Sequence, residues 1–363
     1  MIDKETSKRI TSLRFLLIVF VVFIHNNFTV ESIAESGQNI VFHQNEFGSW
    51  VQLFITQGIA RCAVPLFFLF AAFLQAKKND NYKTLLKKKF FALFVPFVLW
   101  TAIYAFYFAG IKLLILKIAP QFIANPNETA LNWTTLDWFH KLLGYKLKPD
   151  GDFELPGFAY QFWFIRDLII LVILSPLFKT LIKKVPVGFF ALLCILYVSS
   201  TRIYFVATQA LFYYSLGLYW GMFDFNLFEK IDKVPYKEAV SLYLLCFFVE
   251  KLFENKVFGA FRVILSCIIF LKVSKSIIEN AKLFAITEYL AGFSFFLFAI
   301  HTPALNELLK KVWLAVFPMK NTFFSLFEYF GVAFLNIIIG TAIGIALKKL
   351  CPPVFSVLNG GRK

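Results

Sequence analysis

Charged residues are scarce in this 363-residue sequence, and acidic residues are scarcer than basic ones. Only 16% of the residues are charged, and 22 Asp and Glu stand against 37 Lys and Arg, for a formal net charge of +15. In an ordinary soluble domain roughly a quarter of the residues are charged. The shortage therefore excludes an ordinary soluble globular domain.

Cysteine is also rare. The five cysteines are scattered without any Cys-x-x-Cys pair, and four of them lie inside apolar runs: Cys62, Cys194, Cys246 and Cys267. Disulfide frameworks and zinc sites need clustered cysteines or cysteine–histidine sets. We therefore expect neither a disulfide framework nor a metal site.

The sequence lacks the basic stripe with interleaved aromatic residues that a nucleic-acid groove needs. Its lysines gather instead at the ends of apolar runs, where positive charges flank membrane spans. The basic excess therefore predicts contact with a lipid bilayer and no nucleic-acid partner.

The apolar residues, in contrast, are abundant and lie in long runs. They make up 59% of the sequence, and the mean hydropathy is +0.69. The runs are about 15 to 25 residues long, the length of a helix that crosses hydrocarbon, where backbone amides must be satisfied within their own segment. We predict an all-α, polytopic transmembrane helical bundle of about ten spans, at residues 11–28, 50–75, 90–109, 161–178, 186–200, 203–223, 239–253, 257–271, 283–301 and 328–347.

The distribution of Lys and Arg predicts the orientation. With the N-terminus inside, 22 of them fall in cytoplasmic segments and 11 in outer segments, and residues 29–49 contain none. Cytoplasmic segments are the richer in Lys and Arg, so we predict that both termini are cytoplasmic, in a multi-pass protein of the inner (plasma) membrane. Residues 1–350 would form the transmembrane domain and residues 351–363 a short cytoplasmic tail, without an appended soluble domain.

Two regions depart from a simple alternation of spans and short loops. The runs at 239–253 and 257–271 are short because four charged residues crowd their junction, which leaves a re-entrant pair as an alternative. Residues 302–327 mix charged and apolar residues in a pattern typical of an interfacial amphipathic helix.

Four arginines lie within or at the edge of apolar runs: Arg14, Arg61, Arg166 and Arg262. A guanidinium near the middle of the bilayer costs at least about 2.5 kcal/mol on insertion scales, so such residues are candidates for a functional site. The alternative is that each pairs with a carboxylate or reaches the interface. We favour that packing role for Arg262 and leave both interpretations open for the other three.

Arg14 and His25 are predicted to share one face of the first helix. Eleven residues at 100° each come within about 20° of three full turns and span about 16 Å along the axis. With the N-terminus inside, Arg14 lies near the cytoplasmic leaflet and His25 near the outer one. An imidazole suits proton abstraction because its pKa is near neutrality; the alternative for His25 is a structural histidine in the interface.

Arg61 lies four residues before Pro65 in the second apolar run. Proline frees the carbonyl one turn earlier and kinks its helix. A kinked helix with a buried arginine can line a cavity for an anionic ligand, so Arg61 is a further candidate.

Other candidates are weaker. Arg166 precedes Asp167 in the fourth run. The alternative for Arg166 is that its charge is neutralised by contact with another helix. His301 ends the ninth run just before Pro303, and Glu288 lies 13 residues earlier, nearer the cytoplasm. A lone His or Glu at such a position is more often a packing residue than a catalyst.

These residues, in this order, resemble the acyltransferase-3 family of integral membrane O-acyltransferases. Arg14 and His25 match its Arg-x10-His signature, and Arg61-Cys62-Ala63-Val64-Pro65 resembles its second-helix motif. Trp163-Phe164-Ile165-Arg166-Asp167-Leu168 resembles its Trp-Phe-x-x-x-Leu segment, and His301-Thr302-Pro303 its His-x-Pro.

The resemblance extends from residue 7 to about residue 350, with two departures. Ala71-Ala72 replaces the Ser-Gly pair that is usual after the second-helix aromatic run, and Thr11 replaces an acidic residue.

The resemblance implies transfer of an acyl group, usually acetyl, from cytoplasmic acyl-CoA to a hydroxyl of an extracytoplasmic cell-envelope or exported carbohydrate. Acyl-CoA would be a donor substrate, with no permanently bound cofactor. His25 would deprotonate the acceptor hydroxyl, Arg14 would face the donor phosphates, and Arg61 would bind the donor or stabilise the thioester oxyanion. Handover to a separate extracytoplasmic partner would occur in trans.

Other function classes remain as alternatives. A transporter or flippase also uses intramembrane Arg and His residues, but such proteins often contain internal repeats, and the two halves of this sequence show none. Another histidine-dependent membrane acyltransferase class would need its histidine deep in a late helix. A non-catalytic sensor or scaffold would have no need of the Arg14–His25 pair.

Overall fold

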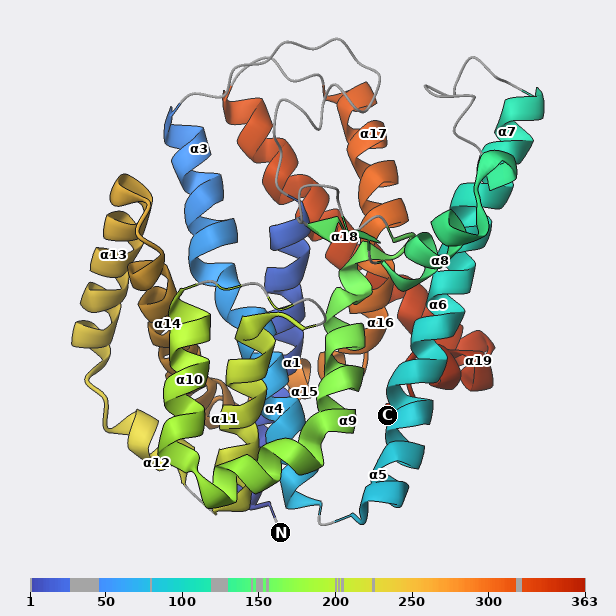
Figure 1. Ribbon diagram of the computed structural model, residues 1–363. Helices are drawn as coiled ribbons and strands as arrows, with labels where there is room; N and C mark the ends of the chain where they lie inside the picture. Colours follow the sequence, from blue (N-terminus) through green and yellow to red (C-terminus); the bar gives the residue numbers. More distant parts are fainter. Residues whose placement is uncertain are drawn as a thin grey trace. The chain divides into compact units, whose positions relative to one another are not determined.

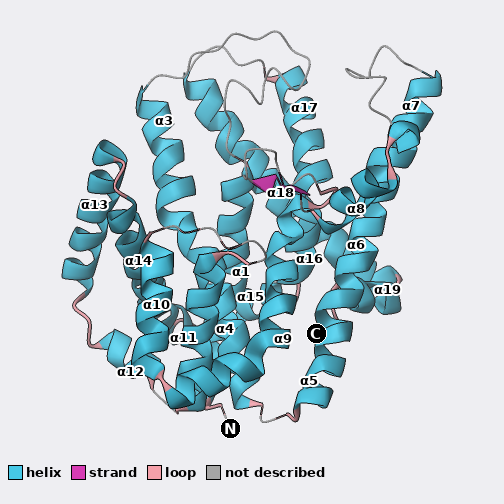
Figure 2. Ribbon diagram, in the orientation of Figure 1, coloured by secondary structure: helices cyan, strands magenta, loops and turns pink. Residues whose placement is uncertain are grey.

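The computed structural model describes residues 2–26, 46–78, 80–118, 130–144, 146–147, 153–154, 157–199, 201, 203, 206–223, 226–317 and 322–362. Within these residues the secondary structure is helical except for two short strands, β1 (Lys146–Leu147) and β2 (Phe153–Glu154), which pair antiparallel (Figure 2). The predicted all-α class is confirmed.

The chain divides into two compact units. The first contains Met1–Asn27, Ser49–Lys89 and Asp167–Ser294, and the second contains Phe28–Gly48, Phe90–Arg166 and Phe295–Lys363. The helices that lie wholly or mostly in the first unit (Figure 1) are α1 (Lys4–His25), α3 (Glu46–Leu53), the π-helix η1 (Phe54–Gly58), the 3₁₀-helix η2 (Ile59–Cys62), α4 (Ala63–Lys77), α5 (Tyr82–Lys89), α9 (Trp163–Lys184), α10 (Pro186–Val198), α11 (Thr208–Met222), α12 (Leu227–Asp232), α13 (Tyr236–Phe253), α14 (Lys256–Glu279) and α15 (Ala281–Ala291).

The remaining elements belong to the second unit. Its helices are η3 (Phe90–Phe94), α6 (Val95–Ala105), η4 (Phe106–Ile111), α7 (Lys112–Ile118), η6 (Ala130–Asn132), α8 (Thr135–Leu143), η7 (Tyr160–Phe162), α16 (Ser294–Ile300), η8 (His301–Leu305), α17 (Asn306–Val316), α18 (Thr322–Leu350) and α19 (Pro352–Leu358).

Each of the ten predicted apolar runs overlaps a helix in the described residues. In the described residues, four helical segments are long and apolar enough to cross a membrane: Glu46–Lys77, Tyr82–Ile118, Lys256–Glu279 and Thr322–Leu350. A fifth is added if Ala281–Ala291 and Ser294–Val316, on either side of a short break, count as one span. The chain is thus a membrane protein with four or five candidate spans by length and composition.

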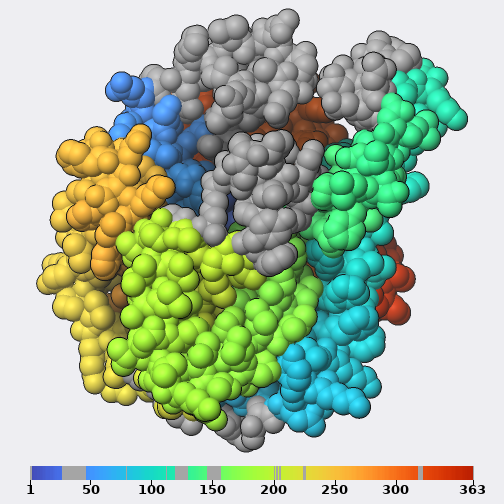
Figure 3. Space-filling model, viewed as in Figure 1, coloured from blue at the N-terminus to red at the C-terminus, as the bar shows by residue number. Residues whose placement is uncertain are grey.

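Large apolar side chains are exposed on several helices, as contact with lipid requires. On α10, Val187 is 82% exposed and Ile195 is 65% exposed. The side chains of α9 and α10 (green in Figure 3) form part of the face seen in that view. Such a density of exposed apolar residues would be unfavourable in water and is favourable in hydrocarbon.

Two small residues let α4 and α11 pack closely. A Cβ atom added to Gly217 would collide with the carbonyl oxygen of Leu69 and lie 2.9 Å from the Ala72 methyl group, and one added to Gly221 would lie 2.9 Å from the Phe73 oxygen. The Gly-x-x-x-Gly spacing puts both glycines on one face of α11. Ala72, one of the departures noted above, is thus accommodated by Gly217.

Three buried polar side chains, hydrogen-bonded in series, join the same helices to α9. The Gln75 side chain donates to Ser175 Oγ at 2.9 Å and accepts from the Tyr214 hydroxyl at 2.9 Å. All three side chains are at most 4% exposed. Since a buried polar group without a partner is costly, the three residues fix α4, α9 and α11 relative to one another.

In the second unit, the C-terminal segment packs against α6. The indole of Trp100 donates to the Leu358 carbonyl oxygen at 3.0 Å. The Arg362 guanidinium donates to the Ala92 carbonyl oxygen at 3.2 Å and lies 4.1 Å from the centre of the Phe295 ring. Residues 351–362 are therefore an integrated part of this unit.

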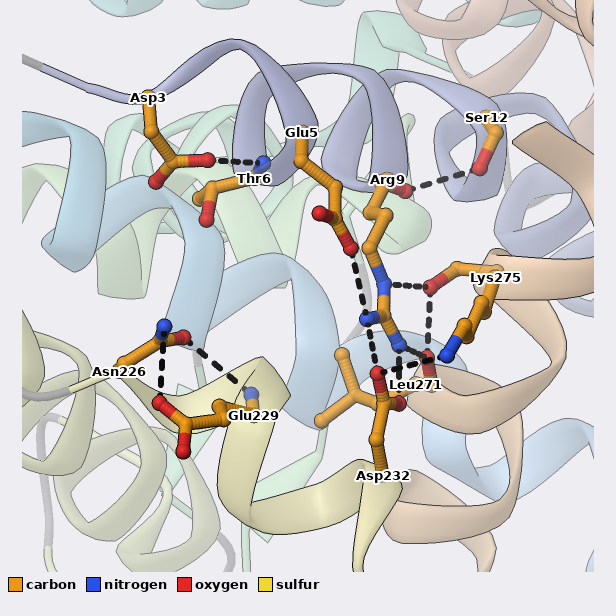
Figure 4. Close-up of polar contacts among 11 residues, drawn as sticks. Asp3, Glu5, Thr6, Arg9, Ser12, Asn226, Glu229, Asp232, Leu271 and Lys275 are labelled. Carbon is orange, nitrogen blue, oxygen red and sulfur yellow. Dashed lines mark hydrogen bonds and ion pairs between the residues drawn. The ribbon is translucent and has the colours of Figure 1, made fainter. Parts of the chain in front are cut away.

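A buried arginine joins α1, α12 and α14 at one end of the first unit (Figure 4). Arg9 is completely buried, and its Nη1 and Nη2 each donate to one oxygen of the Asp232 carboxylate at 2.8 Å. Its Nε donates to Ser274 Oγ at 2.9 Å and its Nη2 to the Leu271 carbonyl oxygen at 2.8 Å. A bidentate pair of this kind adds geometric specificity to the Coulomb attraction.

The remaining contacts complete the arrangement. Arg9 Nη1 lies 3.5 Å from the Glu5 carboxylate, so all five guanidinium N–H groups have an acceptor. The Lys272 ammonium donates to the Asp232 carbonyl oxygen at 2.8 Å. These bonds tie the short helix α12 to both α1 and α14.

Replacing Asp232 by Ala should destabilise the first unit. It leaves the Arg9 charge buried without its main partner, a change that costs about 3 to 5 kcal/mol in comparable pairs. We expect a lower midpoint of thermal unfolding in detergent. Glu229→Gln is the matched control, since the Glu229 carboxylate on the same helix forms exposed contacts, with Lys233 and Asn226; an equal loss in both variants would contradict the role of Asp232.

The same pair should make stability depend on acid. Hydrogen bonds from Arg9 lower the pKa of Asp232 below its usual 3.8. A carboxylate with a lowered folded pKa contributes stability that is complete above the unfolded pKa and is lost as the pH falls through the folded one. The difference in stability between the native protein and Asp232→Ala should therefore shrink below about pH 4.

Candidate functional site

The first candidate residues lie on one uninterrupted helix. Helix α1 is α-helical from Lys4 to His25, with the Asp3 side chain accepting from the Thr6 N–H at its start. Arg14 and His25, 11 residues apart, therefore share a face about 16 Å apart along the axis, as predicted. His25 is half-buried at the last helical position, and residues 27–45 lie outside the described residues.

Arg14 is half-buried and has no hydrogen bond or ion pair with any residue that the structure describes. Helix α1 packs against η1, η2, α4, α14 and α15. Arg14 thus presents its guanidinium donors within a group of packed helices of the first unit.

The segment that carries Arg61 is a helix with an irregular middle. The α-helix α3 gives way to a π-helical turn at Phe54–Gly58 and a 3₁₀ turn at Ile59–Cys62 before α4 begins. The predicted distortion near Arg61 is confirmed, but it extends further towards the N-terminus than Pro65 alone explains. Isolated π turns within helices are often found at functional sites.

Gly58 lies at the junction of the two irregular turns. Its backbone (φ −85°, ψ −93°) departs from helical geometry. A Cβ at this position would lie 2.9 Å from the Tyr243 hydroxyl and 3.2 Å from the Phe247 ring. Glycine is needed here because α13 packs directly against the break.

Helix α14 supplies hydrogen bonds along this break. Arg262 Nη1 donates to the Gly58 carbonyl oxygen at 3.2 Å, and Ser266 Oγ donates to the Ile59 carbonyl oxygen at 3.5 Å. Arg262 also pairs with Glu250 of α13 through both carboxylate oxygens. The predicted packing role of Arg262 is confirmed.

Only one nitrogen of the Arg61 guanidinium, Nε, donates a hydrogen bond to a described residue. Its Nε donates to the Gln57 side-chain oxygen at 2.7 Å, and Nη1 and Nη2 have no hydrogen bond to any described residue. Arg61 is half-buried and lies within electrostatic range of both Arg262 and Glu250.

The described arginines of the first unit therefore fall into two classes. Arg9 and Arg262 are at most 3% exposed and are bonded to carboxylates and backbone carbonyls. Arg14 and Arg61, on the packed elements α1 and η2, keep guanidinium donors that no described residue accepts. Since a guanidinium prefers carboxylate or phosphate partners, the second pair is suited to an anionic ligand.

Arg166 and Asp167 have structural contacts in separate units. Arg166 donates to the carbonyl oxygen of Gly144, the residue that ends α8. The buried Asp167 carboxylate accepts from the N–H of Ala207, the residue that begins α11, at 2.9 Å. A carboxylate at a helix N-terminus is stabilising. These contacts account for both residues without a ligand.

Glu288 and His301 have opposite surroundings. Glu288 is exposed on α15. His301 is fully buried at the start of η8, with Nδ1 2.8 Å from the Phe298 carbonyl oxygen. Because a carbonyl oxygen only accepts, Nδ1 carries the proton and Nε2 is the acceptor nitrogen.

The chain around His301 forms a second helix break. Thr302 has extended backbone angles (φ −147°, ψ 156°), which separates α16 from the helix that follows. The freed carbonyl oxygens are taken up by side chains: the Tyr104 hydroxyl donates to Thr302 at 2.9 Å, the Gln161 amide to Ala299 at 3.0 Å and the Asn336 amide to His301 at 2.8 Å. Non-helical backbone at membrane depth needs such partners.

The three contributing residues, Tyr104, Gln161 and Asn336, were not identified from the sequence, and neither was Glu328. Gln161 and Asn336 lie singly in apolar runs, which was the only signal available. Glu328 at the start of the last run is 1% exposed, neither of its oxygens has a hydrogen bond in the described residues, and Lys310 of α17 lies within electrostatic range. Its carboxylate can accept hydrogen bonds from hydroxyl groups.

No group of three or more His, Cys, Asp or Glu side chains in the described residues is arranged to hold a metal ion.

Comparison with known proteins gives a consistent result. The chain is 23% identical over 380 residues to the succinoglycan biosynthesis protein ExoH of Rhizobium meliloti (strain 1021), covering 99% of this chain and 94% of that protein. No solved structure matches the chain. A family model described as an acyltransferase domain matches residues 7–347, a range that includes Arg14, His25, Arg61 and His301. The chain therefore belongs to the acyltransferase-3 family and is a membrane acyltransferase that transfers groups other than aminoacyl groups.

Proposed function

We propose that this enzyme transfers an acyl group, usually acetyl, from cytoplasmic acyl-CoA to a hydroxyl of an extracytoplasmic cell-envelope or exported carbohydrate. The observation that carries this function is the contrast among the arginines. Arg14 and Arg61 keep donors for an anionic substrate, whereas Arg9 and Arg262 are bonded within the protein. The similarity to a protein of succinoglycan biosynthesis supports a glycan as the acceptor.

The proposed roles follow from the positions on α1 and η2. Arg14 binds phosphate groups of the donor, since guanidinium groups recognise phosphate in a bidentate manner. The donor carries its phosphates at one end and its thioester at the other, so it can extend along α1 towards His25. Arg61 faces the thioester, where a fixed cation in a dry site stabilises a developing oxyanion.

The reaction needs no further co-reactant. The acceptor hydroxyl gives its proton to His25 as its oxygen attacks the thioester carbonyl carbon, and an oxyanion forms beside Arg61. The oxyanion collapses, the carbon–sulfur bond breaks, and the proton passes from His25 to the CoA thiolate. An ester and free CoA are the products.

We also propose ten spans with both termini in the cytoplasm of an inner (plasma) membrane protein. Helices overlap each of the ten apolar runs, and the excess of Lys and Arg on one side supports this orientation. In this topology Arg14 lies towards the cytoplasmic donor and His25 towards the outer acceptor.

His25→Ala should abolish transfer because it removes the proposed general base, a change that lowers rates by about 10²- to 10⁴-fold. The measurement is release of free CoA, and appearance of label on envelope glycans, by purified protein in liposomes supplied with labelled acetyl-CoA. His140→Ala on α8 is the control and should keep full activity. A folded His25→Ala protein with native turnover would contradict the assignment.

Arg61→Lys should also impair transfer, since a point charge does not replace the planar guanidinium fork. We expect a fall in kcat/KM for acetyl-CoA of about 10- to 1000-fold, the range for loss of one oxyanion donor. Arg362→Lys is the matched control. Equal activity of Arg61→Lys and the native protein would exclude a specific role for the guanidinium.

The topology predicts the behaviour of reporter fusions. Green fluorescent protein fused after residue 363 should fluoresce, and alkaline phosphatase fused there should be inactive, because phosphatase folds only outside the cytoplasm. Phosphatase fused after residue 36 should be active. An active phosphatase at the C-terminus would show an odd number of spans.

A further inference from the structure

Building on the proposed function, we propose that the Arg262–Glu250 ion pair is a positioning device that sets where the Arg61 guanidinium meets the acyl donor. Neither residue touches the donor in this arrangement. They act through the carbonyl oxygen of Gly58, at the junction of the π and 3₁₀ turns.

The covalent path from Gly58 to Arg61 is short and stiff. In a 3₁₀-helix there are three residues per turn, so Arg61 follows Gly58 by one turn and projects from the same side. The Gln57 side chain holds Arg61 Nε at 2.7 Å. A shift of the Gly58 peptide therefore moves the Nη1 and Nη2 groups that the substrate would meet.

Arg262 holds that peptide from outside the helix. Its Nη1 donates to the Gly58 oxygen at 3.2 Å, and its Nε and Nη2 each donate to one oxygen of Glu250. Arg262 is 3% exposed, so water does not replace these bonds. Further along α14, Ser266 Oγ reaches the Ile59 oxygen at 3.5 Å and Cys267 Sγ the Cys62 oxygen at 3.9 Å.

Glu250 has a second effect, which is electrostatic. Arg262 lies close enough to Arg61 to repel it, and the Glu250 charge opposes that repulsion. With Glu250 present, Arg262 can donate to Gly58 without adding net charge beside Arg61. Loss of the carboxylate would release the guanidinium from its fixed orientation and push the two cations apart.

Aromatic side chains of α13 pack against the break at Gly58. Phe247 packs on Phe54 with ring centres 5.1 Å apart and lies 6.0 Å from the Arg262 guanidinium. Tyr243 and Phe247 occupy the space beside Gly58. The helix that carries Glu250 is thus packed against the same break that its carboxylate helps to hold.

A double-mutant cycle tests whether Arg262 acts through Arg61. Arg262→Lys keeps the charge but loses the fork that bridges Glu250 and Gly58, and Glu250→Gln keeps the shape but loses the charge. Either change should lower kcat/KM for acetyl-CoA by about 10- to 100-fold, the effect of a misplacement of about 1 Å. In an Arg61→Ala background the same changes should have less than about a twofold effect, because the guanidinium through which Arg262 and Glu250 act is already absent.

Lys251→Gln is the matched control. Lys251 pairs with the same Glu250 oxygen at 3.1 Å and makes no contact with Gly58 among the described residues, so its loss should leave kcat/KM within about twofold of native. Effects of Arg262→Lys and Arg61→Ala that simply multiply would overturn the inference, as would a fall in folded protein with unchanged activity per folded molecule.

Amide hydrogen exchange provides a readout that does not require turnover. In Glu250→Gln, a peptide covering residues 54–62 should exchange at least about tenfold faster than in the native protein. The reason is that Arg262 is no longer held in place to bond the Gly58 carbonyl oxygen. Unchanged exchange there would overturn the inference. If the native protein fails to use acetyl-CoA, the proposed function is contradicted, and the exchange result alone decides whether Arg262 and Glu250 hold the break.

Discussion

A guanidinium group inside a bundle of apolar helices must find acceptors for its five N–H groups, because neither lipid nor a packed core supplies them. Arg9 finds all of them in Asp232, Ser274, Leu271 and Glu5. This arginine joins the start of α1 to α12 and α14, and so fixes the helix on which Arg14 follows about one and a half turns later. Where that requirement is not met internally, the charge remains available to a substrate.

The same requirement applies to the backbone at the two helix breaks. In the first unit the carbonyl oxygens near Gly58 are bonded by α14, and the donor at the centre is itself a charged group. In the second unit those near Thr302 are bonded by neutral side chains, Tyr104, Gln161 and Asn336. The first break is thus held by a charged donor and the second by neutral ones. The first also lies beside Arg61, the residue that we propose meets the anionic donor.

Much of this could be predicted from the sequence because it depends on local pattern. The length of the apolar runs predicted the helices, the 11-residue spacing predicted the shared face of Arg14 and His25, and a packing role was predicted for Arg262. Arg9 was counted only as a cytoplasmic charge, because its partner Asp232 is 223 residues away. Gln161 and Asn336 were missed for the same reason, since their acceptors are 138 and 35 residues distant.

The close contact between α4 and α11 has a consequence for how this sequence can change. The space between the two helices is filled by the methyl group of Ala72 on one side and the bare backbone of Gly217 on the other. A glycine at the position of Ala72 would not make a side chain admissible at position 217, because a Cβ there would still collide with the carbonyl oxygen of Leu69. The dependence between the two positions therefore runs one way: Ala72 requires the glycine opposite, whereas Gly217 is required by the backbone of α4 whatever residue stands at position 72.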